Sequence, residues 1–560
     1  MRRSLAALMV IVLGFGPSAA GQDAPQPSIS ENDLRTWLTY IASDELQGRQ
    51  VYSEGLGLAA AYIASHLKEW GVTPAGDRGT YFQDVRVQGV RTRSNSSVTV
   101  TVNGQTRTFK DGEGVTFPRN QGTKHIVSGE AAFAGYGVSF APLRHDDYAR
   151  VDVGGKVAIF LGRTGPRGFT TAHNRILNAR GRTAIESHRA IATITQAAPN
   201  TPRPQTNVPA ARRVDFQTAQ RLDARIPPQI TAGDEFFSFL FSASGTDYAT
   251  LRAAAERQEP LPDLPLSGVS ITINVDASYE VVQTRLSRNV VGLIEGSDPS
   301  LKDTYVMLGA HYDHIGYEQF AFDDRRNAIA SCTGQTRPTP RPGDIINNGA
   351  DDDGSGTVTL MALARSFAQG PRPRRSLLFV WHTSEEGGLN GSRYMADHPI
   401  VPLDKVSAQL NIDMVGRNRC DDPAEANTVY LVGADRISTE LHNLNEAANA
   451  ALPSPLTLDY EMNDPSDLES LYTRSDHYSY ASKGVPVIFY TTGLHRDYHY
   501  VTDEVDKIEF AKMARIAALV HGTAARLANL DHLPRRDNLG PRMGKGARGP
   551  IAAPAATGSR

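Results

Sequence analysis

The spacing of apolar residues changes along the chain. After Ser30, a residue type favoured at helix starts, apolar residues recur on one helical face, and a second helical pattern ends at Gly71. From about Ser96 apolar and polar residues alternate, and the turn pair Asn103-Gly104 follows. The sequence therefore predicts two covering helices followed by a β-rich unit that extends to about residue 280.

From residue 289 onward, strand-like apolar runs alternate with amphipathic helical patterns. The predicted strands cover residues 289–294, 305–309, 376–381, 407–412, 428–432 and 486–490. This alternation predicts a mostly parallel, mixed sheet with helices on both faces, closed by a long helix over about 507–530. The expected fold class is therefore α/β, with a catalytic domain formed by residues 21–95 and 281–532 and a β-rich insert over 96–280.

The two ends of the chain have compositions unlike the rest. Two arginines, an apolar run over residues 5–15 and small residues at 18–20 predict a signal peptide over 1–20, and hence export to the periplasm or the extracellular space. That run is shorter than the roughly 18 apolar residues needed to cross a bilayer, and no later stretch is long and apolar enough. Residues 533–560 are rich in Arg, Pro, Gly and Ala without periodicity, which predicts a disordered tail.

Composition narrows the function classes. A net charge of -3 over 560 residues gives no field that would attract nucleic acid or an anionic membrane surface. Only two cysteines occur, Cys332 and Cys420, which excludes a disulfide framework and a thiolate zinc site. In an oxidising compartment the two could pair, and otherwise they are free thiols.

Acidic and histidine residues follow several of the predicted strands at their carboxyl ends, where open α/β sheets bind ligands. Three consecutive acids at 351–353 also open a predicted helix. A lone histidine or acidic turn is usually structural, and an Asp-rich loop also suits calcium, but so many on one sheet edge favour a metal site. The candidates after the strands are His311, Asp313, Glu385, Glu386, Asp413, His495 and His499.

Imidazole and carboxylate side chains are zinc ligands, and two neighbouring zinc ions need a shared carboxylate plus about two further ligands each. His311 with Asp413 would complete one site, and Glu386 with one of the two later histidines the other. Glu385 is then free to act as general base on a water that bridges the metals. Asp313 is placed to orient the His311 imidazole or its partners.

Five motifs in this order resemble metallopeptidase family 28, the co-catalytic zinc peptidases, from the N-terminal helices to about Leu530. They are His311-Tyr-Asp313, Asp351-Asp352-Asp353-Gly-Ser-Gly356, Ser384-Glu385-Glu386-Gly387, Asn411-Ile-Asp413-Met, and Tyr498-His499 followed by Asp503. The resemblance implies two zinc ions, Asp352 as the bridging acid, and His499 rather than His495 as a ligand. It also implies that the Tyr498 hydroxyl polarises the scissile carbonyl.

The region 96–280 resembles the protease-associated domain that such catalytic domains often carry as an insert, notably at residues 132–137 and 152–159. The resemblance implies a role in shaping substrate access or binding partners. The chain departs from a compact loop in the long stretch between Gly316 and Asn347, which holds Cys332, whereas Cys420 lies just after Asp413. Because both loops leave the same sheet edge, we predict a disulfide between these cysteines.

The expected function is that of a secreted zinc exopeptidase, an aminopeptidase acting on peptides or small proteins. A carboxypeptidase with the same core is an alternative, in which Arg417, Arg419 or Arg496 would clasp the substrate carboxylate. A glutaminyl cyclase with one zinc and a receptor-like binding protein are further alternatives. The complete set of predicted ligands disfavours both.

Overall fold

The computed structural model describes residues 29–197, 214–317, 332 and 335–537. The predicted signal peptide therefore lies outside the described residues, as do residues 538–560 of the predicted tail. Residues 533–537, which were expected to belong to that tail, instead lie against helix α9 (Thr439–Ala450), where the Arg535 backbone N–H donates to Glu440. Among the described helices, none combines the length and apolarity that a membrane crossing requires.

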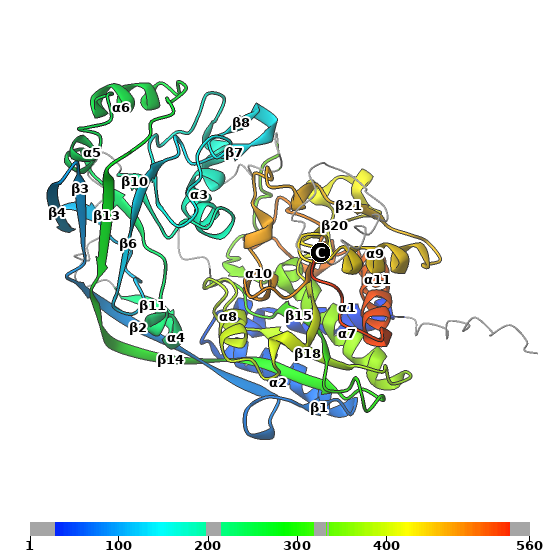
Figure 1. Cartoon of the computed structure of the whole chain (residues 1–560). Coiled ribbons are helices and arrows are strands. Elements are labelled where there is room, and N and C mark those ends of the chain that lie inside the picture. The colour runs from blue at the N-terminus through cyan, green and yellow to red at the C-terminus, as the bar shows by residue number, and fades with distance from the viewer. Residues whose placement is uncertain (1–28, 198–213, 318–331, 333–334, 538–560) are drawn as a thin grey trace, which may run out of the picture.

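One large sheet runs through the half of the molecule that contains the C-terminal helix (Figure 1). Its strands lie in the order β11-β2-β14-β18-β15-β19-β22-β20-β21, and β1 (Thr73–Pro74) pairs with β14. The strands are β11 (Asp215–Thr218), β2 (Phe82–Ser94), β14 (Ala277–Ile294), β18 (Ser376–His382), β15 (Tyr305–His311), β19 (Val406–Ile412), β22 (Val487–Thr491), β20 (Thr428–Val432) and β21 (Thr457–Asp459).

The centre of this sheet is parallel and its flanks are largely antiparallel. Strand β15 pairs in parallel with β18 and β19, and β19 pairs in parallel with β22. On the flanks β14 is antiparallel to β18 and to β2, and β20 is antiparallel to β22. All residues of β18 and β19 are buried, as expected of strands covered on both faces. The predicted mixed α/β sheet is thus confirmed.

Helices cover both faces of the sheet. Alternate residues of β15 show the division, because Leu308 packs into the cluster formed with α1, α2, α7, α9 and α11, whereas Met307 packs with α8 and α10. The predicted long helix over 507–530 is α11. The bounds are α1 (Glu31–Ile41), α2 (Glu54–Glu69), α7 (Gly356–Gln369), α8 (Asn390–Asp397), α10 (His477–Ala481) and α11 (Phe510–Asn529).

A closed barrel with its own apolar core forms the other half of the molecule. Its strands are β3 (Ser97–Val102), β4 (Gln105–Asp111), β5 (Gly114–Thr116), β6 (His125–Phe133), β9 (Val157–Phe160), β10 (Ala192–Gln196), β12 (Gln229–Ala232) and β13 (Val269–Val275). The region is less purely β than expected, because it also forms helices α3 (Asn174–Glu186), α4 (Ala219–Asp223), α5 (Asp234–Leu240) and α6 (Tyr248–Glu256).

The two halves are joined by a long antiparallel ribbon. Strands β2 and β14 pair continuously from Ser94 opposite Ala277 to Phe82 opposite Val290, apart from one irregularity after Val281, and they run from the barrel into the large sheet (Figure 1). Strand β11 lies within the expected insert but pairs with β2 in the large sheet. The boundaries at 96 and 280 stay a prediction about independently folding units.

Candidate metal centre

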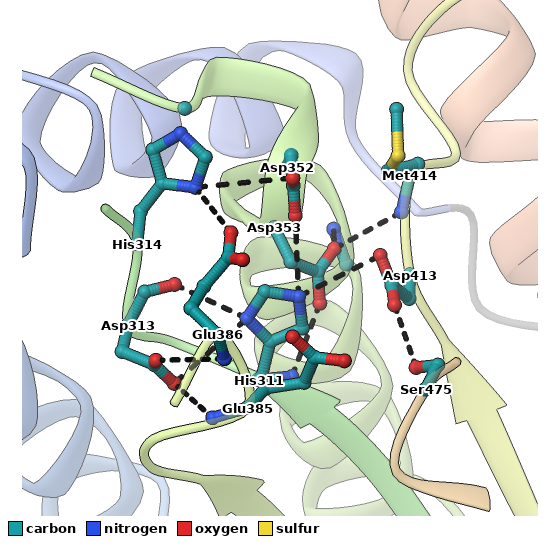
Figure 2. A network of polar contacts seen from close by, with 12 residues as sticks. His311, Asp313, His314, Asp352, Asp353, Glu385, Glu386, Asp413, Met414 and Ser475 are labelled. Atoms are coloured by element: carbon teal, nitrogen blue, oxygen red, sulfur yellow. Dashed lines mark hydrogen bonds and ion pairs between the residues drawn. The ribbon is translucent and has the colours of Figure 1, made fainter. Parts of the chain in front are cut away.

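The candidate site lies at the carboxyl ends of the four parallel strands at the centre of the sheet. Strand β15 ends at His311, β18 is followed within four residues by Glu386, β19 is followed by Asp413, and the loop after β22 carries His499. Because parallel strands point the same way, these side chains meet at one edge although up to 188 residues separate them in the sequence numbering. Figure 2 shows part of this network.

Asp352 lies between two groups of side chains. One of its carboxylate oxygens is 3.2 Å from His311 Nε2, and the other is 3.1 Å from His499 Nε2. The His311 Nε2 atom is also 3.7 Å from an Asp413 oxygen, and the His499 Nε2 atom is 3.1 Å from a Glu386 oxygen. The five predicted zinc ligands are therefore gathered as two pairs around one central carboxylate.

Asp351 and Asp353, which flank Asp352 in the sequence, make different contacts. Asp353 accepts hydrogen bonds from the backbone N–H groups of His311, Gly356 and Met414, at 2.9 to 3.2 Å. It therefore connects the turn formed by residues 351–353, the acid turn, to β15 and to the residue after Asp413. Asp351 is 3.2 Å from His495 Nε2. The three consecutive acids 351–353 look alike in the sequence, as do His495 and His499, but in the tertiary structure each makes different contacts.

Glu385 lines the same cavity as the five predicted zinc ligands, a space of about 320 Å³. Burial raises the pKa of its carboxyl group well above the usual range, and the nearby Glu386 carboxylate raises it further. Asp313 accepts hydrogen bonds from the backbone N–H groups of Glu385 at 3.0 Å and Glu386 at 3.3 Å. Its backbone oxygen lies 3.1 Å from His311 Nδ1, the imidazole that Asp313 was predicted to orient.

Tyr498 lies beside the site, with its ring stacked on the His499 ring at a centroid distance of 4.0 Å. Its hydroxyl oxygen accepts a hydrogen bond from the Arg474 guanidinium at 3.0 Å. Burial raises the pKa of this hydroxyl well above its usual value. The group is therefore a neutral donor within the cavity at ordinary pH.

His314 is a site residue that the sequence reasoning missed. Its Nδ1 atom is 2.9 Å from one oxygen of Glu386 (Figure 2). The other oxygen of Glu386 faces His499. It is buried, and it stands near Asp352 as well, at 3.9 Å. Its position directly after the His311-Tyr-Asp313 motif was a signal in the sequence, because it adds a second histidine at the same strand end.

Two other side chains hold the site without any local sequence signal. Arg49 is fully buried and donates to the backbone oxygens of Tyr312, Asn348 and Gly349, at 2.7 to 2.9 Å, so it joins the loop after β15 to the acid turn. The Ser475 hydroxyl donates to Asp413 at 2.6 Å. Arg49 is more than 260 residues from Tyr312, a separation that no periodicity argument can bridge.

The charge balance of the site fits metal cations. Six carboxyl groups and three imidazoles are gathered there, and burial raises the pKa of Asp413 despite its proximity to His311. Burial would lower the pKa of His499, but Glu386 and Asp352 raise it to about 10. Buried carboxylates in excess need compensating positive charge, and the mixture of imidazole nitrogen and carboxylate oxygen is the donor set of zinc. The carboxyl groups belong to Asp313, Asp352, Asp353, Glu385, Glu386 and Asp413.

The predicted disulfide is confirmed, because Cys332 and Cys420 are bonded. The three arginines suggested for a substrate carboxylate are in contrast committed to acidic side chains of the protein. Arg417 pairs with Asp421 and Asp497, Arg496 with Asp421, and Arg419 with Glu461. The sequence placed them near the site, but their partners come from loops whose approach only the fold defines.

Comparison with known proteins gives matches to the region that carries this site. Residues 289–524 match the model of Peptidase family M28. A probable aminopeptidase of Saccharomyces cerevisiae is 27% identical over 39% of this chain and 60% of its own length. Leucine aminopeptidase 1 of Ajellomyces dermatitidis is 30% identical over 37% of this chain and 57% of its own length. The chain thus spans less than two thirds of the length of these relatives.

Solved structures give broader but more distant matches. An aminopeptidase from Aneurinibacillus sp. strain AM-1 aligns with 93% of this chain and 98% of its own, at 18% identity and a TM-score of 0.42. A zinc aminopeptidase from Bacillus subtilis aligns with 91% of this chain and 97% of its own, at 16% identity and a TM-score of 0.42. Residues 289–524, the region that matches the Peptidase family M28 model, contain every residue of the predicted ligand set.

Proposed function

We propose that this protein is an exported aminopeptidase that holds two zinc ions and hydrolyses peptides or small proteins. The observation that carries the proposal is the position of Asp352, with one carboxylate oxygen facing His311 and the other facing His499. A carboxylate shared in this way is what two adjacent metal ions require. His311 with Asp413 would hold one ion, and Glu386 with His499 the other.

The side chains around the proposed ions have distinct tasks. Bound zinc would supply Lewis-acid polarisation of the scissile carbonyl and a lowered pKa for the attacking water. Glu385 is free of the ligand set, so its carboxylate can take the proton of that water and return it to the leaving amine. The Tyr498 hydroxyl would donate to the oxyanion as the carbonyl carbon becomes tetrahedral.

The name aminopeptidase rests on less than the metal site does. The matched relatives are named aminopeptidases, and the three arginines considered for a carboxypeptidase are paired with protein acids. Both observations support release of N-terminal residues over C-terminal ones. Comparing N-terminally blocked with C-terminally blocked peptides separates the two activities.

Export is proposed from two independent features. The sequence pattern of residues 1–20 is that of a signal peptide, and the Cys332–Cys420 disulfide suits an oxidising compartment. We therefore place the protein in the periplasm or outside the cell. Recovery of a mature chain lacking the first 20 residues from the secreted or periplasmic fraction would support this location, and an unprocessed cytoplasmic protein would contradict it.

The test of the activity combines metal analysis with one substitution. We expect two zinc ions per chain and release of leucine from leucine p-nitroanilide, and we expect Glu385→Gln to retain both metals while kcat falls by about 10²- to 10⁴-fold. Full activity of Glu385→Gln would refute the proposed base. One zinc per chain would favour the cyclase, and no hydrolysis of any peptide by zinc-loaded protein would favour a binding protein.

A further inference from the structure

A second cavity, of about 740 Å³, opens between the barrel half and the sheet half. Its walls come from α3, from residues 218–229 near α4, from α8, and from the segment 470–483 around α10. In Figure 1 helix α3 lies on the side of the barrel that faces the sheet half. The cavity is thus built jointly by the two halves of the chain.

This cavity adjoins the metal site. Three residues, Arg393, Thr473 and Arg474, line both the large cavity and the smaller one that holds the candidate zinc ligands. Arg474 also donates to the hydroxyl of Tyr498, which stacks on His499. A peptide whose scissile bond lies at the metals would therefore lie next to residues that line the large cavity.

The walls of the large cavity carry a strong excess of positive charge. Seven Arg or Lys residues line it, against two acidic residues, Glu186 and Asp397. Both acids are engaged, because Glu186 accepts a hydrogen bond from the Tyr478 hydroxyl and Asp397 pairs with Lys483 at 2.7 Å. Among the arginines, Arg175 and Arg474 pair with Glu469 at 3.2 and 3.0 Å. Arg221 and Arg393, in contrast, have Asp397 nearby but form no ion pair with it.

Two of these arginines face the cavity without an ion-pair partner. In the described part of the chain, neither Arg221 nor Arg393 has a carboxylate within 4.0 Å, and both are half-buried. Burial and the neighbouring charges of Arg221 and Arg182 lower the pKa of Arg393 to about 10. Like charges that crowd into a half-buried space without partners are stabilised by an anion from outside.

We propose that this cavity binds a carboxylate of the peptide substrate, on the part of the peptide that extends away from the metals. The inference rests on the proposed peptidase function and adds a substrate class, namely peptides with a free α-carboxylate or an acidic side chain. Planar guanidinium groups bind carboxylates through paired hydrogen bonds, which is why arginines rather than lysines predominate in such sites. The barrel half supplies Arg182 and Arg221 and the sheet half supplies Arg393, whereas Arg474 is paired with Glu469.

Binding of small probes to the zinc-loaded full chain tests the proposal without requiring turnover. The probes are the α-amide of N-acetylglutamate, N-acetylglutamine, and the α-amide of N-acetylglutamine, which carry a side-chain carboxylate, an α-carboxylate and no carboxylate. We expect at least one of the first two to bind about tenfold or more tightly than the third in calorimetry. The probe that binds identifies the source of the carboxylate, and equal binding of all three would overturn the proposal.

Two variants in the cavity wall and one control variant far from it test whether the carboxylate binds in this cavity. Arg221→Gln, and Arg225→Glu at an exposed position of the cavity wall, should each weaken the preferred carboxylate probe by about tenfold. Arg150→Gln removes an arginine exposed elsewhere on the barrel half, paired with Asp263, and should change nothing. Unchanged binding by both folded cavity variants would refute the assignment.

Kinetics then separate this inference from the proposed function. Leucine p-nitroanilide has no carboxylate, so Arg221→Gln should hydrolyse it like the wild type, whereas KM for a leucyl dipeptide that carries the preferred carboxylate should rise about tenfold. A protein that binds the carboxylate probe but hydrolyses nothing would contradict the peptidase function alone. Hydrolysis of both substrates with no carboxylate preference would contradict the cavity assignment alone.

Discussion

The carboxylate of Asp313 accepts a hydrogen bond from the backbone N–H of Glu385 at 3.0 Å. Its second oxygen accepts from the next backbone N–H, that of Glu386, at 3.3 Å. One buried side chain after β15 therefore positions the proposed general base and a proposed zinc ligand, both of which follow β18. This explains how adjacent glutamates can take different roles, because their shared backbone is fixed from one side.

Replacing this acceptor should loosen the metal site. In Asp313→Asn one carboxylate oxygen becomes an NH2 group that cannot accept the hydrogen bond from the backbone. We expect zinc affinity to fall by about 10- to 100-fold and kcat to fall with it, as measured by chelator competition and leucine p-nitroanilide hydrolysis. Asp303→Asn, at an exposed position before the start of β15, is the matched control. Unaltered zinc retention in Asp313→Asn would contradict this role.

His314 should matter for one metal more than for the other. Its Nδ1 atom contacts Glu386 at 2.9 Å, on the side of Asp352 that His499 occupies. We expect His314→Ala to weaken one zinc ion by about 10- to 100-fold while the ion held by His311 and Asp413 stays bound. Zinc content during stepwise dialysis against a chelator measures this, and simultaneous loss of both ions would count against it.

The disulfide should contribute measurably to stability. Cys332 and Cys420 close a loop with a sequence separation of 88, for which the chain-entropy model gives about 4.6 kcal/mol. We expect the double variant Cys332→Ser/Cys420→Ser to lose up to about this much unfolding free energy in urea. A reductant should destabilise the wild type in the same experiment and leave the double variant unaffected. Equal stability of the two proteins would show that the bond constrains little.

His521 should make the protein sensitive to mild acid. Its ring stacks on Phe367 at a centroid distance of 4.1 Å, and burial lowers its pKa to about 4. Between pH 6.5 and pH 4 the unfolded chain binds a proton at this site that the folded chain does not, so the free energy of unfolding falls as the pH falls. This group is expected to contribute up to about 1.4 kcal/mol per pH unit within that window.

The substitution that isolates this effect is His521→Gln. Its stability relative to the wild type should improve as the pH is lowered from 7 to 5, as measured by urea unfolding at several pH values. A constant difference between the two proteins across that range would mean that His521 does not titrate as its burial indicates.

Several features followed from the sequence because their causes are local. Apolar runs gave the predicted strands β15, β18, β19, β20 and β22 to within about two residues at each end, since buried parallel strands are continuously apolar. The assignment of His311, Asp413 and Glu386 to one edge followed from the rule that carboxyl ends of parallel strands meet. The pairing of Cys332 with Cys420 followed from the same placement.

Other features were settled only by contacts between distant segments. Asp351, Asp352 and Asp353 are chemically equivalent in the sequence. In the structure Asp353 accepts hydrogen bonds from backbone N–H groups of β15 and of the segment after β19, and Asp351 contacts His495. These contacts leave Asp352 as the carboxylate between the two groups of predicted ligands. The arginine-lined cavity unites segments from residue 175 to residue 483 and has no periodic or local signature. The sequence by itself thus determined which chemistry gathers at the sheet edge, because strand direction is encoded locally. Only the tertiary structure decided which oxygen faces which nitrogen, because hydrogen-bond partners and burial depend on segments hundreds of residues apart.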